Sequence, residues 1–127
     1  MSDLNRAKAV CESQNLTISI LLLTNPNNPL GVIYSPSTIS SCIGWARDQN
    51  RGNTVHVLVD EIYALSEFGS FGNKFEQQFV SAAKVLDNDL GDDVHILWGL
   101  SKDFGSSGFR CGFLYTQNDL VKQVRMC

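Results

Sequence analysis

Apolar positions along this chain follow two patterns, unbroken runs and spacings of three to four residues. Unbroken runs rich in large aliphatic residues are typical of strands buried in a sheet, and they predict strands at residues 17–24, 55–59, 94–98 and 111–116. Helical spacing of apolar residues predicts helices at residues 3–14, 36–49 and about 75–86, and a polar helix from about Asp119. The second helix has a clear start signal, because Ser35 supplies a capping hydroxyl and Pro36 suits the first helical position.

The order of these elements determines the expected fold. Helices separate the first three strands, which is typical of a parallel α/β sheet covered by helices on both faces. Only a short bend connects the third strand to the fourth, so the fourth strand is expected to run antiparallel. We therefore predict an α/β fold with a mostly parallel sheet, three parallel strands and an antiparallel fourth, within residues 1–127.

In open α/β sheets, ligands bind at the carboxyl ends of the parallel strands. The polar side chains that this topology brings to one edge are Asn25, Asn28, Asp60, Tyr63, Ser101 and Lys102. Each has a simpler interpretation when taken alone: turn chemistry for Asn28, helix capping for Asp60 and half-buried packing for Tyr63. As a set at one edge they indicate a polar site.

The segment after the third strand suggests a more specific chemistry. Lys102 stands at the strand end, before a bend rich in glycine and serine, and Arg110 follows eight residues later. A lysine partly screened from water has a lowered pKa and is a usable nucleophile toward a carbonyl. Arg110 offers a planar fork of donors suited to a phosphate, although a surface ion pair would also explain it. Together the two residues suggest a site for an aldehyde that carries a phosphate.

Other motifs are interpreted as coincidental or structural. Residues 57–61 resemble the acidic strand of P-loop ATPases, but the sequence has no G-x-x-x-x-G-K-[ST] motif. Residues 103–105 spell the magnesium-binding tripeptide of protein kinases without the loops that accompany it. His56 and His95 have no metal partner at useful spacing, so both are interpreted as structural and no metal site is expected.

Charge and composition limit the partners. The 127-residue chain has a net charge of −3 and no basic cluster, which argues against a nucleic acid or an anionic membrane as a partner. Its four cysteines form no C-x-x-C pair, a usage typical of thiols in a reducing compartment. The first residues lack the apolar core of a signal peptide, and no apolar run is long enough to span a bilayer. A cytoplasmic protein is expected.

Three motifs, in this order, resemble the class I/II aminotransferases, which are pyridoxal-phosphate enzymes of fold type I. They are Asn-Pro-Asn-Asn-Pro-Leu-Gly at residues 25–31, Val-Asp-Glu-Ile-Tyr at 59–63, and Ser-Lys-Asp-Phe-Gly with Gly-Phe-Arg-Cys-Gly at 101–112. Within that family the motifs are most similar to the 1-aminocyclopropane-1-carboxylate synthases, and among these to the synthase-like proteins of animals. The resemblance extends from about residue 18 to the C-terminus.

The resemblance implies a role for each residue at the sheet edge. Lys102 would form a Schiff base with the aldehyde of pyridoxal 5′-phosphate and then act as general base at the substrate Cα. The remaining contacts to the cofactor would be divided among Asp60 at the pyridine nitrogen, Asn28 and Tyr63 at the ring 3′-oxygen, and Ser101 and Arg110 at the phosphate.

Two departures from the family pattern matter. Gly99 stands where the enzymes usually carry a phosphate-binding serine, and the loss of one charge-assisted hydrogen bond costs about 1.5–3 kcal/mol of cofactor affinity unless water replaces it. The family's chains are also much longer. Their N-terminal phosphate turn, their small C-terminal domain and its substrate-carboxylate arginine have no counterpart here, so residues 1–127 are expected to form part of a large domain.

Two functions remain open from the sequence. The first is the pyridoxal-phosphate-binding segment of an enzyme that acts on small α-amino acids, with S-adenosylmethionine as a candidate substrate and a homodimer as the full-length form. Cyclopropane-forming elimination, transamination and β-elimination all need the same residues. The second is a catalytically silent homologue that acts by cofactor binding or protein interaction.

Overall fold

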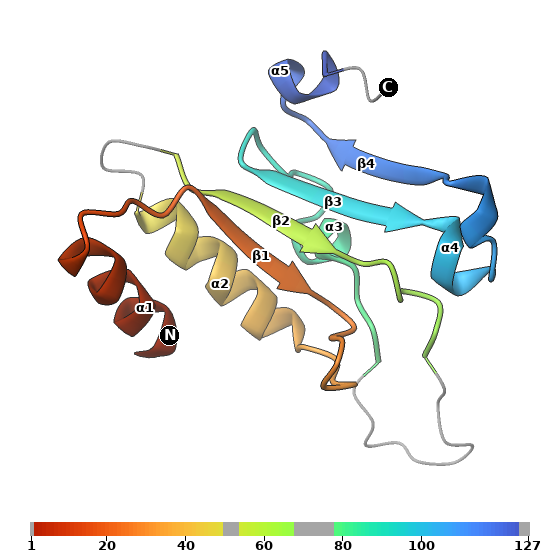
Figure 1. Cartoon of the computed structure of the whole chain (residues 1–127), viewed down its shortest axis with the longest axis horizontal. Coiled ribbons are helices and arrows are strands. Elements are labelled where there is room, and N and C mark those ends of the chain that lie inside the picture. Colours follow the sequence, from red (N-terminus) through yellow and green to blue (C-terminus); the bar gives the residue numbers. More distant parts are fainter. Residues whose placement is uncertain (1, 50–53, 68–77, 125–127) are drawn as a thin grey trace.

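The computed structural model describes residues 2–49, 54–67 and 78–124, and its centre is one four-stranded sheet in the order β1-β2-β3-β4 (Figure 1). The first three strands run parallel, and β4 runs antiparallel to β3. The α/β fold with a mostly parallel sheet is therefore confirmed. The strands are β1 (Ile20–Thr24), β2 (His56–Asp60), β3 (Val94–Gly99) and β4 (Gly112–Thr116).

Helices connect or flank these strands; four of those in the described residues follow the predicted pattern, and the two short ones between residues 100 and 109 lie in the segment predicted as a bend. The helices are α1 (Ser2–Ser13), α2 (Pro36–Asp48), α3 (Ala82–Val85), α4 (Leu100–Asp103), a 3-10 turn η1 (Ser107–Phe109) and α5 (Asp119–Lys122). The start of α2 is as predicted, because the Ser35 hydroxyl accepts a hydrogen bond from the Thr38 amide at 3.0 Å and Pro36 opens the helix.

The third helix is shorter than the apolar spacing predicts. Residues 78–80 are not helical, and the expected position Phe75 lies outside the described residues. Ser81 caps the helix by accepting a hydrogen bond from the Ala83 amide at 3.2 Å. Asp87 and Asn88 follow with φ angles of 51° and 63°, which stop any continuation. The cap and this left-handed turn set the two ends, and apolar spacing alone does not reveal either.

The core lies on one face of the sheet. Figure 1 shows α2 and α3 on the same side of the strands, and the two helices contact each other. Val57 and Val59 are fully buried there, packed with Ile39 and Ile43 of α2. Side chains alternate between the two faces of a strand, so every second residue of β2 belongs to this core.

The opposite face of the sheet is open in this chain. Ile20 and Leu22 of β1 are 62% and 58% exposed, whereas the alternate residues Leu21 and Leu23 pack against the core. The expectation that this strand is covered on both faces is therefore wrong for the described residues. The continuous apolar run is real, but no described helix lies over Ile20 and Leu22.

A chain of hydrogen bonds crosses three strands at the edge where β2 and β3 begin. His56 Nδ1 lies 2.9 Å from His95 Nε2, and His95 Nδ1 lies 2.7 Å from the Thr116 hydroxyl. His95 is only 6% exposed. Both of its ring nitrogens have hydrogen-bond partners, as buried polar groups usually do.

Three further features of the described residues are the character of the helices, the grouping of metal-binding side chains and the state of the cysteines. Among the helices of these residues none is both long enough and apolar enough to cross a membrane. Over the same residues no three or more His, Cys, Asp or Glu side chains are grouped to hold a metal. Cys11, Cys42 and Cys111 are free and half-buried, and burial raises the pKa of the Cys42 thiol. Cys127 lies outside the described residues.

Candidate active site

The parallel strands end at one edge of the sheet, and the predicted site residues follow them directly (Figure 1). Thr24, the last residue of β1, is in register with Asp60, the last residue of β2. Asp60 is in turn in register with Leu97 of β3. Because the three strands finish side by side, the three motifs, which are far apart in sequence, begin at the same edge.

The loop after β1 is held in a fixed shape by its asparagines. Asn25 is fully buried. Its backbone amide donates to the Asp60 backbone carbonyl at 2.9 Å, and its side-chain Oδ1 accepts from the Tyr34 backbone amide at 2.8 Å. Its Nδ2 is buried without a hydrogen-bond partner among the described residues. Asn27 closes the turn by accepting from the Gly31 amide at 2.8 Å, where Gly31 has a φ of 64°. These bonds leave Asn28 exposed at the rim of the loop.

Three of the predicted site residues meet at this edge. Asn28 Nδ2 donates to the Tyr63 hydroxyl at 3.2 Å. The Nζ of Lys102 lies 5.9 Å from the centre of the Tyr63 ring, a cation–π distance. An amide, a phenol and an amine from three separate segments are thus gathered around one aromatic ring.

Asp60 is placed on the open face of the sheet. It alternates with Val57 and Val59, which point into the core, and it is half-buried. Its Oδ1 accepts a hydrogen bond from the Ile62 amide at 3.1 Å, which starts the turn toward Tyr63. The carboxylate therefore stands at the carboxyl end of β2, on the face that α2 and α3 do not cover.

Ser101 and Arg110 lie on the segment that follows β3. Ser101 is half-buried in α4, next to Lys102. Arg110 is exposed, has a φ of 51°, and donates from Nη1 to the Ser107 carbonyl at 3.1 Å. Its guanidinium is thus bonded within its own loop, and within the described residues no hydrogen bond joins it to Ser101 or Lys102.

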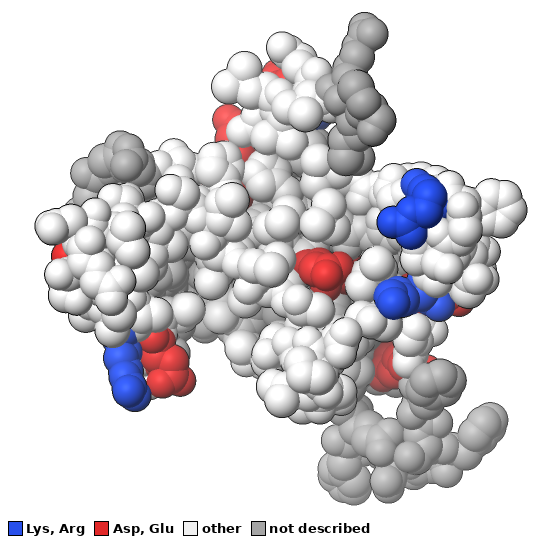
Figure 2. All heavy atoms as spheres, in the orientation of Figure 1, with Lys and Arg blue, Asp and Glu red and all other residues white. Residues whose placement is uncertain are grey.

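Lys102 is exposed, so the expectation that its amine is partly screened from water is wrong for this chain. α4 follows the carboxyl end of β3, and the described residues around it leave the Lys102 side chain exposed. Figure 2 shows basic atoms over α4 and the residues after it, and an acidic group nearer the middle of the same face. The rest of that face carries few charged atoms in this view.

A pocket of about 770 Å³ opens beside the Asn28–Tyr63 pair. Its wall is formed by the loop after β1 and the turn after β2, and its lining residues are Pro26, Asn27, Asn28, Pro29, Gly31, Val32, Ile33, Tyr63, Ser66 and Glu67. This volume falls within the range of small-molecule sites.

Glu61 has a structural role that the sequence interpretation did not assign. It is 5% exposed, and its Oε1 accepts a hydrogen bond from the Ala82 amide at 2.7 Å, at the start of α3. Burial raises the pKa of this carboxyl, and hydrogen bonds from the Ala82 amide and the Ser81 side chain oppose the shift. The period-two alternation could have revealed it, because Val57, Val59 and Glu61 all point to the core face.

The family comparison agrees with this geometry. The profile of the family described as "Aminotransferase class I and II" matches residues 1–127. The chain belongs to this family. The resemblance predicted from the three motifs is therefore confirmed.

Several curated relatives of the chain are 1-aminocyclopropane-1-carboxylate synthases or synthase-like proteins. The chain is 38% identical over 114 residues to a 1-aminocyclopropane-1-carboxylate synthase of Nicotiana tabacum, covering 87% of this chain and 21% of that protein. It is 43% identical over 101 residues to a human protein named "Probable inactive 1-aminocyclopropane-1-carboxylate synthase-like protein 2", covering 80% of this chain and 16% of that one. The chain thus spans about a fifth of the length of these relatives.

Solved structures show the same fold. The aspartate aminotransferase of Thermotoga maritima matches with a TM-score of 0.63 at 24% identity, covering 87% of this chain and 27% of that one. A pyridoxal-phosphate-bound C-S lyase of Staphylococcus hominis matches with a TM-score of 0.67 at 19% identity, covering 94% and 26%. The predicted fold type I sheet is confirmed by these neighbours.

Proposed function

We propose that this chain is the pyridoxal-phosphate-binding segment of an enzyme that acts on α-amino acids, with Lys102 as its nucleophile. The observation that carries the proposal is the meeting of Asn28, Tyr63 and Lys102 at the carboxyl edge of the sheet. Family membership supports it, as do the relatives named as synthases and aminotransferases. Residues 1–127 would form part of the large domain of a longer, homodimeric cytoplasmic protein.

The side chains at this edge fit the chemistry of the cofactor. The joined amide and phenol of Asn28 and Tyr63 suit a ring oxygen, and the Asp60 carboxylate on the open face suits a protonated ring nitrogen. Ser101 and Arg110, which follow β3, would hold the phosphate. When bound, pyridoxal phosphate supplies an aldehyde that condenses with amines and a ring that stabilises negative charge at the substrate Cα.

Each of these residues would then have a definite task. Lys102 would hold the cofactor at its aldehyde through Nζ, and the same Nζ, once displaced by the substrate amine, would accept the proton from the substrate Cα. The Asp60 carboxylate would bind the ring nitrogen, which would favour the protonated ring. Tyr63 and Asn28 fix the orientation of the ring by hydrogen bonds, which aligns the reacting atoms.

The substrate is proposed to be an α-amino acid, and S-adenosylmethionine is the first to test because several relatives are named as 1-aminocyclopropane-1-carboxylate synthases. In that reaction the carbanion at Cα displaces methylthioadenosine from the γ-carbon, which closes a three-membered ring. Transamination and β-elimination begin with the same proton transfer. Release of methylthioadenosine from added S-adenosylmethionine distinguishes the cyclopropane-forming reaction from these two.

Covalent labelling tests the cofactor assignment. The chain is mixed with pyridoxal phosphate, reduced with borohydride and digested, and the modified lysines are identified by mass spectrometry. We expect Lys102 to be labelled at a concentration roughly tenfold below that needed for Lys8, Lys84 or Lys122, a preference of about 1.4 kcal/mol. Equal labelling of Lys102 and these three other lysines, or none at Lys102, would contradict the proposal.

A second ligand isolates the phosphate contacts. Pyridoxal carries the same aldehyde without the phosphate. If Arg110 and Ser101 hold the phosphate, Arg110→Ala should lower labelling of Lys102 by pyridoxal phosphate and leave labelling by pyridoxal unchanged. An equal loss for both aldehydes would show that Arg110 acts on the fold of the loop and not on the phosphate.

The second candidate function is a catalytically silent homologue. It is favoured by Gly99, which removes a phosphate-binding hydroxyl of the family pattern, and by the human relative named as probably inactive. This function predicts selective labelling of Lys102, or cofactor binding without labelling, and no methylthioadenosine from S-adenosylmethionine. Turnover would exclude it.

A further inference from the structure

Asp103 binds three separate donors through its carboxylate. Its Oδ2 accepts hydrogen bonds from the Trp98 indole nitrogen at 2.8 Å and the Leu65 amide at 3.1 Å. Its Oδ1 accepts one from the Ser66 hydroxyl at 2.7 Å. The side chain is half-buried. Hydrogen bonds to a charged acceptor are stronger than neutral ones. These three bonds therefore form a stable junction between Asp103 and its three donors.

The donors come from different elements, and two of them belong to the turn that carries Tyr63. Trp98 lies on β3, whereas Leu65 and Ser66 lie after β2, so the carboxylate links two segments whose sequence positions differ by 37 and 38. The turn itself is rigid, because the Ser66 amide donates to the Tyr63 carbonyl at 3.0 Å. Holding Ser66 therefore holds the backbone of Tyr63.

The other end of the junction is the helix that carries the candidate nucleophile. Asp103 follows Lys102 directly in α4, a single helical turn (Figure 1). α4 has no side-chain cap at its N-terminus; the Leu100 amide bonds the Cys111 carbonyl at 3.2 Å, and the Asp103 carboxylate adds the contacts to the turn after β2. The contact of Lys102 Nζ with the Tyr63 ring spans the same two segments that Asp103 ties together.

We propose that Asp103 is a positioning residue that holds the Tyr63 turn against α4 and so sets the distance between Tyr63 and Lys102. Its importance for chemistry rests on the function proposed above for Lys102. The geometric part does not, since it concerns two side chains of this chain alone. Asp103 thus joins the candidate site, although the family motif that contains it, at residues 101–105, assigned it no role.

The hydrogen-bond pattern separates a conservative variant from a disruptive one. In Asp103→Asn, the amide oxygen can take the place of Oδ2 and accept from Trp98 and Leu65. The amide nitrogen then faces the Ser66 hydroxyl, which can reverse and accept. Asp103→Ala removes all three bonds and leaves the indole nitrogen and the Leu65 amide without their acceptor. The asparagine variant should therefore preserve the junction, and the alanine variant should lose it.

The experiment measures the Tyr63–Lys102 contact directly in the 127-residue chain. Nuclear Overhauser effects between the Lys102 side-chain methylenes and the Tyr63 ring report their proximity without any cofactor. We expect the signal in the parent and in Asp103→Asn, and its loss in Asp103→Ala. Asp119→Ala, which removes only the surface ion pair with Lys122 in α5, is the matched control and should retain it.

Labelling adds the functional readout. The selectivity of pyridoxal phosphate for Lys102 over Lys84 should fall roughly tenfold in Asp103→Ala, because the loss of these hydrogen bonds frees the Tyr63 turn from α4, and recover in Asp103→Asn. If the parent shows no selectivity for Lys102 but the Overhauser pattern follows the variants, the proposed function fails and the positioning role stands. If Asp103→Ala keeps both the contact and the selectivity, the positioning role is overturned.

A milder variant covers the case in which Asp103→Ala does not fold. Ser66→Ala removes one bond from the Tyr63 side and leaves α4 and Trp98 untouched. The positioning role predicts a weakened Tyr63–Lys102 signal in this variant, with normal dispersion elsewhere in the spectrum. An unchanged signal in folded Ser66→Ala would overturn the proposal.

Discussion

The Asn28 side-chain amide donates a hydrogen bond to the Tyr63 hydroxyl across 35 positions of sequence. Both residues are at the rim of the same pocket, one on the loop after β1 and the other on the turn after β2. This side-chain bond joins two of the three motifs from which the family resemblance was derived, beside the backbone bond from Asn25 to Asp60. It also defines where a ring oxygen would be bound, because an amide donor and a phenol converge there.

The first prediction concerns that pair. Tyr63→Phe keeps the ring but removes the hydroxyl, so pyridoxal phosphate should bind about 1 kcal/mol more weakly, roughly fivefold, for one lost neutral hydrogen bond. Asn28→Ala should have a similar effect. Because the two groups also bond each other, the double variant should lose less than the sum of the single losses. Fluorescence titration with the cofactor measures all three variants.

Tyr115→Phe provides the control for this cycle, since Tyr115 is an exposed tyrosine of β4 outside the pocket lining. Its affinity should equal that of the parent. Strictly additive losses in the double variant would contradict the coupling inferred from the 3.2 Å bond.

The second prediction concerns Gly99, where the family pattern usually has serine. A Cβ at this position would lie 3.1 Å from the Cys111 carbonyl oxygen, in the antiparallel pairing of Gly99 with Gly112. That carbonyl also accepts a hydrogen bond from the Leu100 amide at 3.2 Å, so it cannot move freely. Gly99→Ser should therefore destabilise the fold by about 1–3 kcal/mol, as overpacked sites do, and should not strengthen cofactor binding. Urea unfolding measures the free energy of unfolding, and titration with pyridoxal phosphate measures the cofactor affinity.

Gly108→Ala is the matched control, because a Cβ there has no neighbour within 4 Å. It should change the free energy of unfolding by less than about 0.5 kcal/mol, as surface substitutions usually do. A Gly99→Ser protein as stable as the parent, with tighter cofactor binding, would show that the β3–β4 pairing does not exclude the serine.

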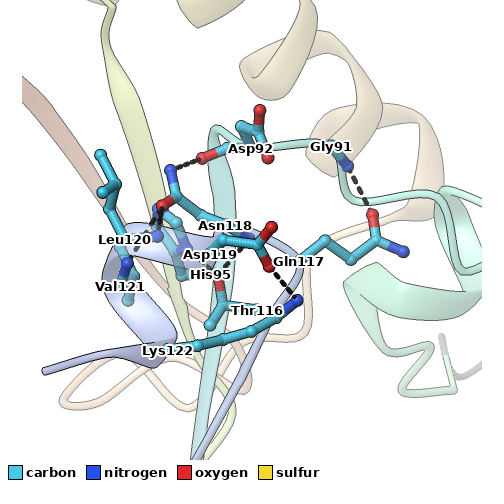
Figure 3. Close-up of polar contacts among 10 residues, drawn as sticks. All are labelled: Gly91, Asp92, His95, Thr116, Gln117, Asn118, Asp119, Leu120, Val121 and Lys122. Atoms are coloured by element: carbon cyan, nitrogen blue, oxygen red, sulfur yellow. Dashed lines mark hydrogen bonds and ion pairs between the residues drawn. The ribbon is translucent and has the colours of Figure 1, made fainter. Parts of the chain in front are cut away.

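The third prediction is a loss of stability in mild acid. Burial lowers the pKa of His95, and neighbouring His56 lowers it further, while Asp93, held in an ion pair with Arg47, acts in the opposite direction. Figure 3 shows His95 bonded to Thr116 close to the residues that start α5. The charged residues Asp119 and Lys122, also drawn there, form an ion pair with each other. The charged groups that act on the pKa of His95 are His56 and Asp93.

A histidine with a lowered folded-state pKa binds fewer protons when folded than when unfolded. Its contribution to stability is therefore fully present above the ordinary pKa of about 6.5 and is lost as the pH falls below it, with a slope of at most about 1.4 kcal/mol per pH unit for one proton. Urea unfolding at about pH 7.5 and about pH 5.5 brackets this window. His95→Gln should be less stable at the higher pH and should show a flatter pH dependence. An equal slope in both proteins would remove His95 as the cause.

The fourth prediction concerns the open sheet face. Ile20 and Leu22 are exposed on β1, which is also an edge strand of the described sheet, with a partner strand on one side. Exposed apolar faces and free edges promote association, so the isolated chain should self-associate. Leu22→Lys should shift it toward the monomer in size-exclusion chromatography with light scattering.

The cost of that change should be small, because Leu22 is already 58% exposed. Val57→Lys, at a fully buried position of the other face, is the contrasting variant and should unfold the chain. A parent chain that is monodisperse, monomeric and cooperatively melting would contradict the prediction.

Sequence pattern was most informative where chemistry is local. The Ser35-Pro36 start of α2 depends on one hydroxyl and one ring, and it is found as predicted. The antiparallel direction of β4 follows from the shortness of the bend before it. The helix near residue 82 was predicted too long, because a serine cap and a left-handed turn, not apolar spacing, set its ends.

In the candidate site, too, some features follow from the sequence pattern and others do not. The residues at the strand ends, Asp60 and Lys102 among them, follow from parallel topology, which the element order predicts. The exposure of Lys102 and the three bonds of Asp103 do not follow from it. Both depend on which elements of the folded chain lie next to α4, and such contacts join residues distant in sequence.

By itself, the sequence determined the family, the order of the strands and of α1, α2, α3 and α5, and the edge at which polar side chains gather, because each of these depends on local pattern and on short motifs. Tertiary structure alone decided that the sheet is open on one face, that His56 pairs with His95, and that Asp103 links the Tyr63 turn to α4. These relationships depend on side-chain distances between separate strands, and residue spacing along a chain does not specify such distances.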